Sequence, residues 1–192
     1  SKAAPSVVVF NPLPWDRKDV VRIDIEGASI PDNPTIFDCE GRMGPAQVEG
    51  DELIFMADVP SLGYATYYLV KGTEANRRGG GGLALENESL RVEVDGSSGG
   101  IASIYDKRAS RFVTKVQDDE TTRPFLSNLF QVFHEAPHGM SAWVIGKITR
   151  VDNLVSGADV RPASSGPVMT KISSVRKYRG STIGQDIVLY NG

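Results

Sequence analysis

The chain has 192 residues, a formal net charge of −3 and one cysteine, with 40% hydrophobic and 23% charged residues. This length allows one or two domains with a sizeable core, and the composition is ordinary for a globular protein. A single cysteine excludes an internal disulfide and a thiolate zinc site. With no long apolar run and no basic stripe, we expect neither a membrane nor a nucleic acid as partner. Low cysteine usage and the lack of an export signal favour a cytoplasmic location.

The first 72 residues carry strand signals at close spacing and no helical periodicity. A β-branched and aromatic run at 7–10, stopped by Asn11 and Pro12, predicts a buried strand. Alternation at 21–25 predicts a strand with one wet face. Further strands are expected at 35–38, 46–49, 52–57 and 62–70, and the tyrosines of the last one favour packing on both sides. Closely spaced strands of this kind predict a small antiparallel β-sandwich, which we place at residues 1–75.

Residues 71–82, KGTEANRRGGGG, have low apolar content, two adjacent arginines and four consecutive glycines. Such a composition is typical of a flexible connection. We therefore predict a linker and a domain boundary at 71–82, with a second domain at 83–192.

The strongest local signal lies at 83–107, LALENESLRVEVDGSSGGIASIYDK. Leu90, Val92 and Val94 alternate with charged residues, which places the apolar set on one face of a strand. A five-residue glycine and serine segment and a second apolar run follow, and together they predict a β-hairpin.

Beyond this hairpin, residues 106–123 are polar and charged, which predicts an exposed excursion. The alternating pattern within 168–177 predicts a strand with one buried and one wet face. With no helical pattern in either half, the expected fold class is all-β. The other expected strands are at 129–134, 147–154, 158–161 and 182–190.

Residues 134–138, His-Glu-Ala-Pro-His, match the H-E-x-x-H pattern of zinc peptidases. That pattern needs a helix, and Pro137 would break one. The flanking residues favour a strand that runs into a loop, and the chain has no third histidine. We therefore reject a zinc site here.

Other candidate chemistry is weaker. The acidic run 118–120 is typical of a solvated surface rather than of a glycosidase acid pair. Trp15 and Trp143 could each stack on a sugar ring, although packing is the commoner role. We expect no catalytic, cofactor or metal site in these residues, and the candidates for sugar or interface contact are Trp143, Trp15 and His134.

Five separate pieces of the chain, in order, resemble the β-rich region that follows the catalytic domain in the glycoside hydrolase family 38 α-mannosidases. The pieces are VVVFNPLPWDRKDVV, PSLGYATYYL, LENESLRVEVDGSSGGIASIYDK, NLFQVFHEAPHGMSAW, and SGPV with STIGQDIVLY. The chain departs from the family at the fourth piece, where Ser141 and Val144 stand in place of two aspartates.

The resemblance implies a small β-sandwich followed by part of a large, mutarotase-like super-sandwich domain. It implies a parent enzyme that hydrolyses terminal α-mannosidic bonds with retention and uses zinc, held in an N-terminal catalytic domain that these residues do not include. The piece itself would be non-catalytic and inactive alone. Its partner would be that catalytic domain of the same polypeptide, with carbohydrate bound through the parent. The strand at 182–190 would lack family partners along one edge, so self-association is expected.

Two alternatives from other classes stay open. A stand-alone carbohydrate-binding module would be favoured by an aromatic platform exposed on a sheet face. A mutarotase-like sugar-binding domain would need a histidine and a carboxylate that converge in a cleft. His134 and Glu135 are the sequence candidates, but adjacent residues of a strand point to opposite faces.

Overall fold

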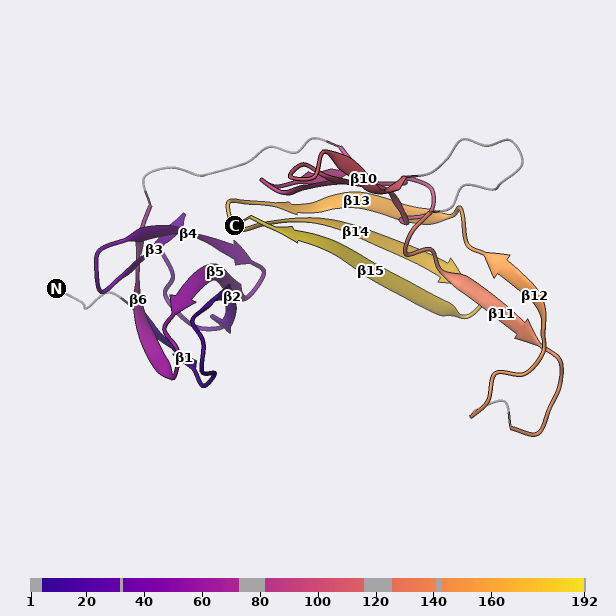
Figure 1. The fold of residues 1–192 in the computed structure, drawn as a ribbon, viewed down its shortest axis with the longest axis horizontal. Helices are drawn as coiled ribbons and strands as arrows, with labels where there is room; N and C mark the ends of the chain where they lie inside the picture. The colour runs from indigo at the N-terminus through magenta and orange to yellow at the C-terminus, as the bar shows by residue number, and fades with distance from the viewer. Residues whose placement is uncertain (1–4, 32, 73–81, 116–125, 141–142, 192) are drawn as a thin grey trace. The chain divides into compact units, whose positions relative to one another are not determined.

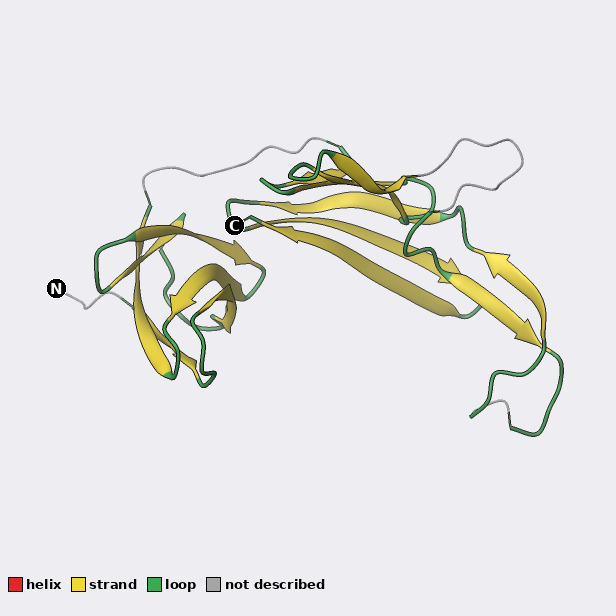
Figure 2. Cartoon of the chain, viewed as in Figure 1, coloured by secondary structure: helices red, strands yellow, loops and turns green. Residues whose placement is uncertain are grey.

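The computed structural model describes residues 5–31, 33–72, 82–115, 126–140 and 143–191, and every regular element within them is a β-strand (Figures 1 and 2). The strands pair antiparallel, so the predicted all-β class is confirmed. None of the described residues forms a helix that could cross a membrane.

The chain divides into two compact units. The first unit comprises Ser1–Gly79, Ser164–Thr170 and Leu189–Gly192, and the second comprises Gly80–Ala163 and Lys171–Val188. The first unit therefore includes two late segments in addition to the N-terminal strands. Most of the predicted linker, residues 73–81, lies outside the described residues, as does the acidic run 118–120.

A six-stranded antiparallel sheet, in the order β1-β6-β3-β4-β5-β2, forms the first unit. Strand β4 pairs with β3 through its first residues and with β5 through its last ones. This change of partner lets the sheet fold over its own core, where the rings of Phe55 and Tyr67 lie 5.2 Å apart. The strands are β1 (Ser6–Asn11), β2 (Arg17–Asp24), β3 (Pro34–Asp38), β4 (Met43–Glu49), β5 (Glu52–Val59) and β6 (Gly63–Lys71).

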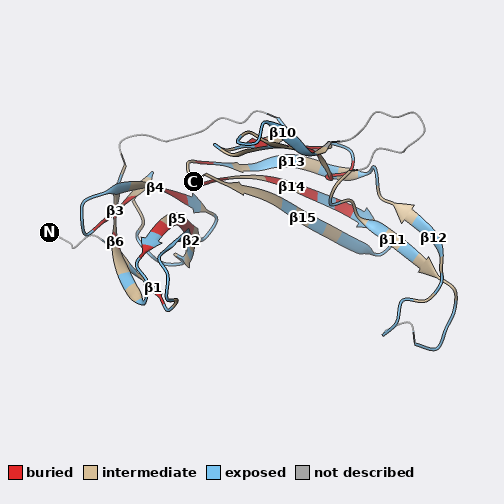
Figure 3. Ribbon diagram, viewed as in Figure 1, coloured by how far each residue is buried: buried red, intermediate tan, exposed pale blue. Residues whose placement is uncertain are grey.

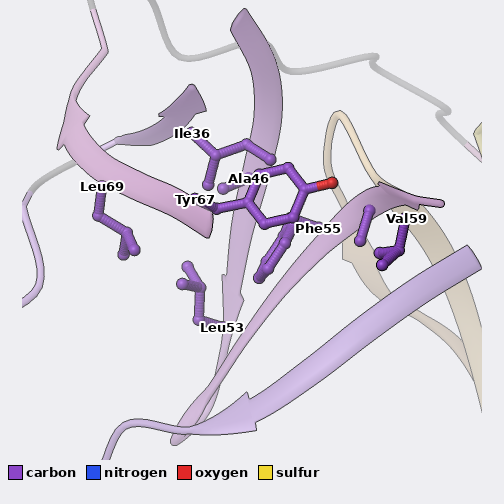
Figure 4. Close-up of a cluster of buried hydrophobic side chains, with 8 residues drawn as sticks. Ile36, Ala46, Leu53, Phe55, Val59, Tyr67 and Leu69 are labelled. Carbon is purple, nitrogen blue, oxygen red and sulfur yellow. The ribbon is translucent and has the colours of Figure 1, made fainter. Parts of the chain in front are cut away.

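The core of the first unit collects the apolar residues of alternating positions (Figure 4). Tyr67 also satisfies its polar end there, because its hydroxyl donates to the Asp58 carbonyl at 2.8 Å and accepts from the Asp58 N–H at 2.7 Å. Burial of each large side chain contributes roughly 2 kcal/mol. The buried members are Ile36, Ala46, Leu53, Phe55, Ala57, Val59, Tyr67 and Leu69.

Gln47 fixes the late segment 164–170 inside the first unit. Its side-chain amide donates to Ser164 Oγ at 2.9 Å, and its carbonyl oxygen accepts from the N–H groups of Val168 at 3.2 Å and Met169 at 2.9 Å. A Cβ at residue 166 would collide with the Gln47 amide, so this position requires glycine. The predicted one-sided burial is therefore wrong at the start of this strand: Val168 and Met169 are both fully buried.

The second unit contains a four-stranded sheet, a two-stranded hairpin and most of a three-stranded sheet. The remaining residues of the three-stranded sheet, within Ser164–Thr170 and Leu189–Gly192, belong to the first unit. The four-stranded sheet runs β10-β9-β8-β7, with β7 (Ala84–Glu86), β8 (Leu90–Val94), β9 (Ile101–Asp106) and β10 (Arg111–Lys115). The hairpin is β11 (Gln131–Glu135) with β12 (Ile148–Asn153), and the third sheet is β13 (Ala158–Ser165), β14 (Met169–Tyr178) and β15 (Ser181–Tyr190).

Strand β10 corrects the prediction that residues 106–123 are only an exposed excursion. Arg111 pairs with Asp106 and Phe112 with Tyr105, and the two aromatic rings lie 5.1 Å apart. A short chain reversal after β9 is enough to add β10 to the sheet, although the residues of β10 are mostly polar or exposed.

The predicted hairpin of 83–107 is confirmed as β8 and β9. Asp95 holds its turn, because its carboxylate accepts from the Ser98 N–H at 2.7 Å and from the Ser98 hydroxyl at 2.6 Å. Gly99 has a φ of 71°, and a Cβ there would lie 2.6 Å from Ser174 of β14. Glycine is therefore required both by the backbone and by the close approach of β14.

Arg176 of β14 is the buried residue at the centre of the contact between β14 and the β8–β9 turn. It is 5% exposed, and its guanidinium donates to the carbonyls of Leu154, at 2.6 Å, and Ser98. The guanidinium also lies 5.9 Å from the centre of the Phe130 ring. Burial lowers the pKa of Arg176 from its ordinary value. One side chain thus connects the β8–β9 turn, the end of β12 and the segment before β11.

Candidate functional site

The three predicted contact residues lie in different places. Trp15 is in the turn between β1 and β2 of the first unit, where its carbonyl accepts from the Asn11 side chain at 2.8 Å. His134 is in β11, and Trp143, 86% exposed, is in the loop that joins β11 to β12. The structure therefore brings only His134 and Trp143 onto one hairpin, which is the candidate site (Figure 1).

The residues of the H-E-x-x-H match do not act together. His134 and Glu135 end a strand and His138 follows in a loop, as the sequence predicted. His134 Nε2 lies 2.8 Å from Asp152, whereas His138 Nε2 lies 2.7 Å from Glu135. Among the residues that the structure describes, no three potential metal ligands gather in one place.

Asp152 of β12 is the centre of the first pair. Antiparallel pairing places His134 opposite Arg150 and close to Asp152. Arg150 Nη2 lies 3.2 Å from Asp152 and 2.9 Å from His134 Nε2, and the Tyr178 hydroxyl donates to Asp152 at 3.3 Å. The hydrogen bond from His134, and then the charge of Arg150, hold the pKa of Asp152 below its ordinary value.

The mutarotase-like alternative required a histidine and a carboxylate to converge, and His134 converges with Asp152 rather than with Glu135. That carboxylate already accepts from Arg150 and Tyr178 as well. The sequence did not point to Asp152, because its partner in β11 is 18 residues away and only the strand register brings the two together.

Glu135 of β11 closes the loop between the two strands. One oxygen of its carboxylate accepts from His138 at 2.7 Å and from the Gly146 N–H at 3.0 Å. A Cβ at Gly146 would lie 2.6 Å from the His138 ring, so the two ends of the loop are in close contact. The His138 hydrogen bond, followed by the Gly146 N–H, lowers the pKa of Glu135. We call this arrangement the Glu135 clasp.

Both carboxylates of the hairpin have lowered pKa values, and this sets the sign of their pH dependence. Each contributes stability that is present above the ordinary carboxyl pKa. That contribution is lost as the pH falls through the lowered value in the folded chain.

The described part of the loop between β11 and β12 is exposed along most of its length (Figure 3). It carries four large apolar side chains that lie in solvent in this structure, which we call the apolar tip: Met140, Trp143, Val144 and Ile145. Several large apolar side chains exposed together are unusual on a solvated surface and are typical of an interaction site.

A second exposed group lies on the first unit, on the side of β1 and β6 that faces away from the core. Phe10 pairs with Tyr64, their rings lie 5.8 Å apart, and they are 73% and 65% exposed. Alternate positions of β6 place Tyr68 on the same face, where it stacks on Phe37 of β3 at 5.2 Å. We call Phe10, Phe37, Tyr64 and Tyr68 the aromatic face.

The aromatic face corrects two predictions. Residues 7–10 were expected to be a buried strand, but only Val7 and Val9 of the run turn toward the core. The strand at 62–70 was expected to be packed on both sides, and this is wrong at Tyr64. In both strands alternation buries one set of side chains and leaves the other set in solvent.

Comparison with known proteins gives two findings. Residues 85–192 match the family described as glycosyl hydrolases family 38 C-terminal domain. An α-mannosidase of Canavalia ensiformis is 28% identical over 112 residues, which cover 45% of this chain and 11% of that relative. The match therefore spans a small part of the relative's length. The family match in this chain covers β8–β15 and most of β7.

Proposed function

The chain belongs to glycosyl hydrolase family 38, through the C-terminal domain of that family, and from this membership we propose that it is the non-catalytic β-region of an α-mannosidase. The proposed parent enzyme hydrolyses terminal α-mannosidic bonds with retention and depends on zinc. Its catalytic domain is the proposed partner of this chain, in the same polypeptide. The chain's role is to support that domain.

The apolar tip carries this proposal. An element that supports another domain needs an apolar surface to bury, and interfaces between domains bury on the order of 600 to 1,500 Å². Trp143 and Ile145, both strongly exposed, offer such a surface at the end of a hairpin whose loop is fixed by the Glu135 clasp. Aromatic side chains such as Trp143, once buried in an interface, often supply most of its binding energy.

Zinc fits the proposed parent but not the described residues of this chain. His134 and His138 each face a different carboxylate, and the described residues gather no set of three ligands. We therefore place the metal in the catalytic domain and assign it no step here. The free thiol of Cys39 supports a proposed cytoplasmic location, because exposed free cysteines are characteristic of reducing compartments.

We also propose that the isolated chain can self-associate. Strand β15 is at an edge of its sheet, next to β14. Ten residues long, it carries Asp186 as its one charged side chain, so it has little to discourage pairing with another strand. Light scattering on the isolated chain would detect dimers, and a strict monomer at high concentration would oppose this proposal.

The experiment for the main proposal uses the isolated chain. We expect no hydrolysis of an aryl α-mannoside, with or without added zinc, because the described residues gather no set of metal ligands and each carboxylate of the hairpin is already bonded to a histidine. A variant with His134→Ala and His138→Ala is the matched control. Turnover by the unaltered chain that is lost in this variant would show that the hairpin is catalytic and that the proposal is wrong.

The aromatic face favours a second candidate, a carbohydrate-binding module. Exposed aromatic rings can stack on sugar rings, and Phe10 with Tyr64 supplies two of them side by side. Retention of the chain on insoluble mannan, lost in Phe10→Ala with Tyr64→Ala but kept in Trp143→Ala, would support this candidate. Equal retention of all three proteins would remove it.

A further inference from the structure

Strand β1 is an edge of the six-stranded sheet, where β6 is its neighbour among the described strands. Its six residues, SVVVFN, are rich in β-branched and aromatic side chains and include no charged one. Every other edge strand in the described ranges carries at least one charged residue, and β13 also has a proline. Charges and proline are the usual devices that keep an edge strand from pairing with another chain. The β1 edge therefore lacks the protection that the other edges have.

The free side of β1 presents a row of backbone groups that can pair with a further strand. The Leu69 N–H donates to the Pro5 carbonyl at 2.9 Å. From this bond on, every second residue of β1 turns its backbone groups toward β6, as an antiparallel ladder requires. The residues between them, Ser6, Val8 and Phe10, turn their N–H and C=O groups away from β6. In the part of the chain that the structure describes, these outward groups take part in no other hydrogen bond.

The side chains along this edge indicate what kind of strand fits it. Val8 is 47% exposed and Phe10 is 73% exposed, and both lie on the solvent side of the sheet. Their partners in β6, Thr66 and Tyr64, are uncharged as well. A charged partner would find no ion pair here, whereas an uncharged strand with small and apolar residues at alternate positions would. β1 is itself such a strand, so it is complementary to a second copy of itself.

We propose that β1 pairs antiparallel with β1 of a second copy of this chain, so that two six-stranded sheets join across a two-fold axis. The register that uses all three outward residues places Val8 opposite the partner subunit's Val8. It also places Phe10 opposite the partner subunit's Ser6, which is small enough to leave room for the ring. This contact is separate from the one proposed for β15, which is an edge of another sheet. It does not depend on the proposed function, because it needs only the contacts of the first unit.

A two-fold axis at Val8 allows a direct test, because position 8 of one copy meets position 8 of the other. Val8→Lys and Val8→Asp should each weaken dimerisation about tenfold, since like charges directly opposite each other repel. An equal mixture of the two variants should recover the dimer, because lysine then faces aspartate. Sedimentation velocity over a range of concentrations measures the dimer fraction, and circular dichroism checks that each variant is folded.

Two matched controls separate this contact from general effects of charge. Thr66→Lys adds the same charge on the same face, one strand further in. In the dimer its two copies would be about 14 Å apart, beyond the Debye length of about 8 Å at physiological salt, so dimerisation should be unchanged. Thr182→Lys, at an exposed position of β15, should also leave it unchanged. A mixture that stays monomeric, or a control that is as damaging as Val8→Lys, would overturn the proposal.

Amide hydrogen exchange on the unaltered chain covers the case in which a variant folds poorly. The N–H groups of Val8 and Phe10 face solvent in the monomer and are bonded in the proposed dimer. Their exchange should slow about tenfold at a concentration where nine tenths of the chain is dimeric. The N–H groups of Val7 and Val9 are turned toward β6 in both states, so they are internal controls and should change little. Exchange at Val8 and Phe10 that does not depend on concentration would refute the pairing.

Discussion

Replacement of Arg176 by methionine is expected to reduce the free energy of unfolding by about 3 kcal/mol, because it leaves buried carbonyl groups without a donor. The guanidinium donates to the carbonyls of Ser98 and Leu154, and methionine offers no N–H to either. Part of the loss is offset, since a buried cation is itself costly. The unpaired carbonyls cost more than removal of the cation recovers, so the net effect is a loss of stability.

Urea unfolding, followed by circular dichroism, measures this effect. The control is Lys177→Met, on the next position of β14, where the side chain is exposed. We expect the midpoint to fall in Arg176→Met, whereas the free energy of unfolding of the control should stay within about 0.5 kcal/mol of the original. Arg176→Lys should fall between the two, because a single ammonium group does not reproduce the planar fork of donors. Equal midpoints for Arg176→Met and Lys177→Met would contradict this account of the second unit.

The second large effect is expected in the first unit, where Gln47 and Gly166 depend on each other. Gln47→Ala leaves the N–H groups of Val168 and Met169 without their acceptor in a fully buried place, at a cost of about 3 kcal/mol. Gly166→Ala adds a methyl group where the 7% exposed Gln47 amide now lies, and it should cost a similar amount by displacing that amide.

The two substitutions should not add. Once Gln47 is alanine, the space beside residue 166 is empty, so the added methyl group has nothing to displace. We expect the double variant to be about as stable as Gln47→Ala alone, and a double-mutant cycle measures this coupling. Fully additive losses would mean that the contact between Gln47 and Gly166 does not hold residues 164–170 in the first unit.

The sequence predicted the strands where alternation is regular. Val21 to Ile25 and Leu90 to Val94 each show a period of two, and a buried face against a solvated face requires that period. The glycine and serine turn at 96–100 was predictable for the same local reason. Local pattern was also sufficient to reject a helix at 134–138, because Pro137 is incompatible with one.

The residues that organise each unit were not predictable in this way, because their partners are remote in the chain. Gln47 meets Met169 across 122 positions, and Arg176 meets Ser98 across 78. Both are polar residues, and the usual expectation for polar residues is exposure. Asp152 was missed for the same reason. The exposure of Phe10 and Trp143 was also hidden, since an aromatic residue signals burial until the packing of its strand or loop is known.

The measurement that tests the central claim most directly is immunoprecipitation from the native source with an antibody raised against this chain. If the chain is a supporting β-region of an α-mannosidase, the antibody should capture a polypeptide several times heavier than 20.8 kDa. The captured material should also hydrolyse an aryl α-mannoside in a zinc-dependent reaction. Capture of a 20.8 kDa protein without that activity would contradict it.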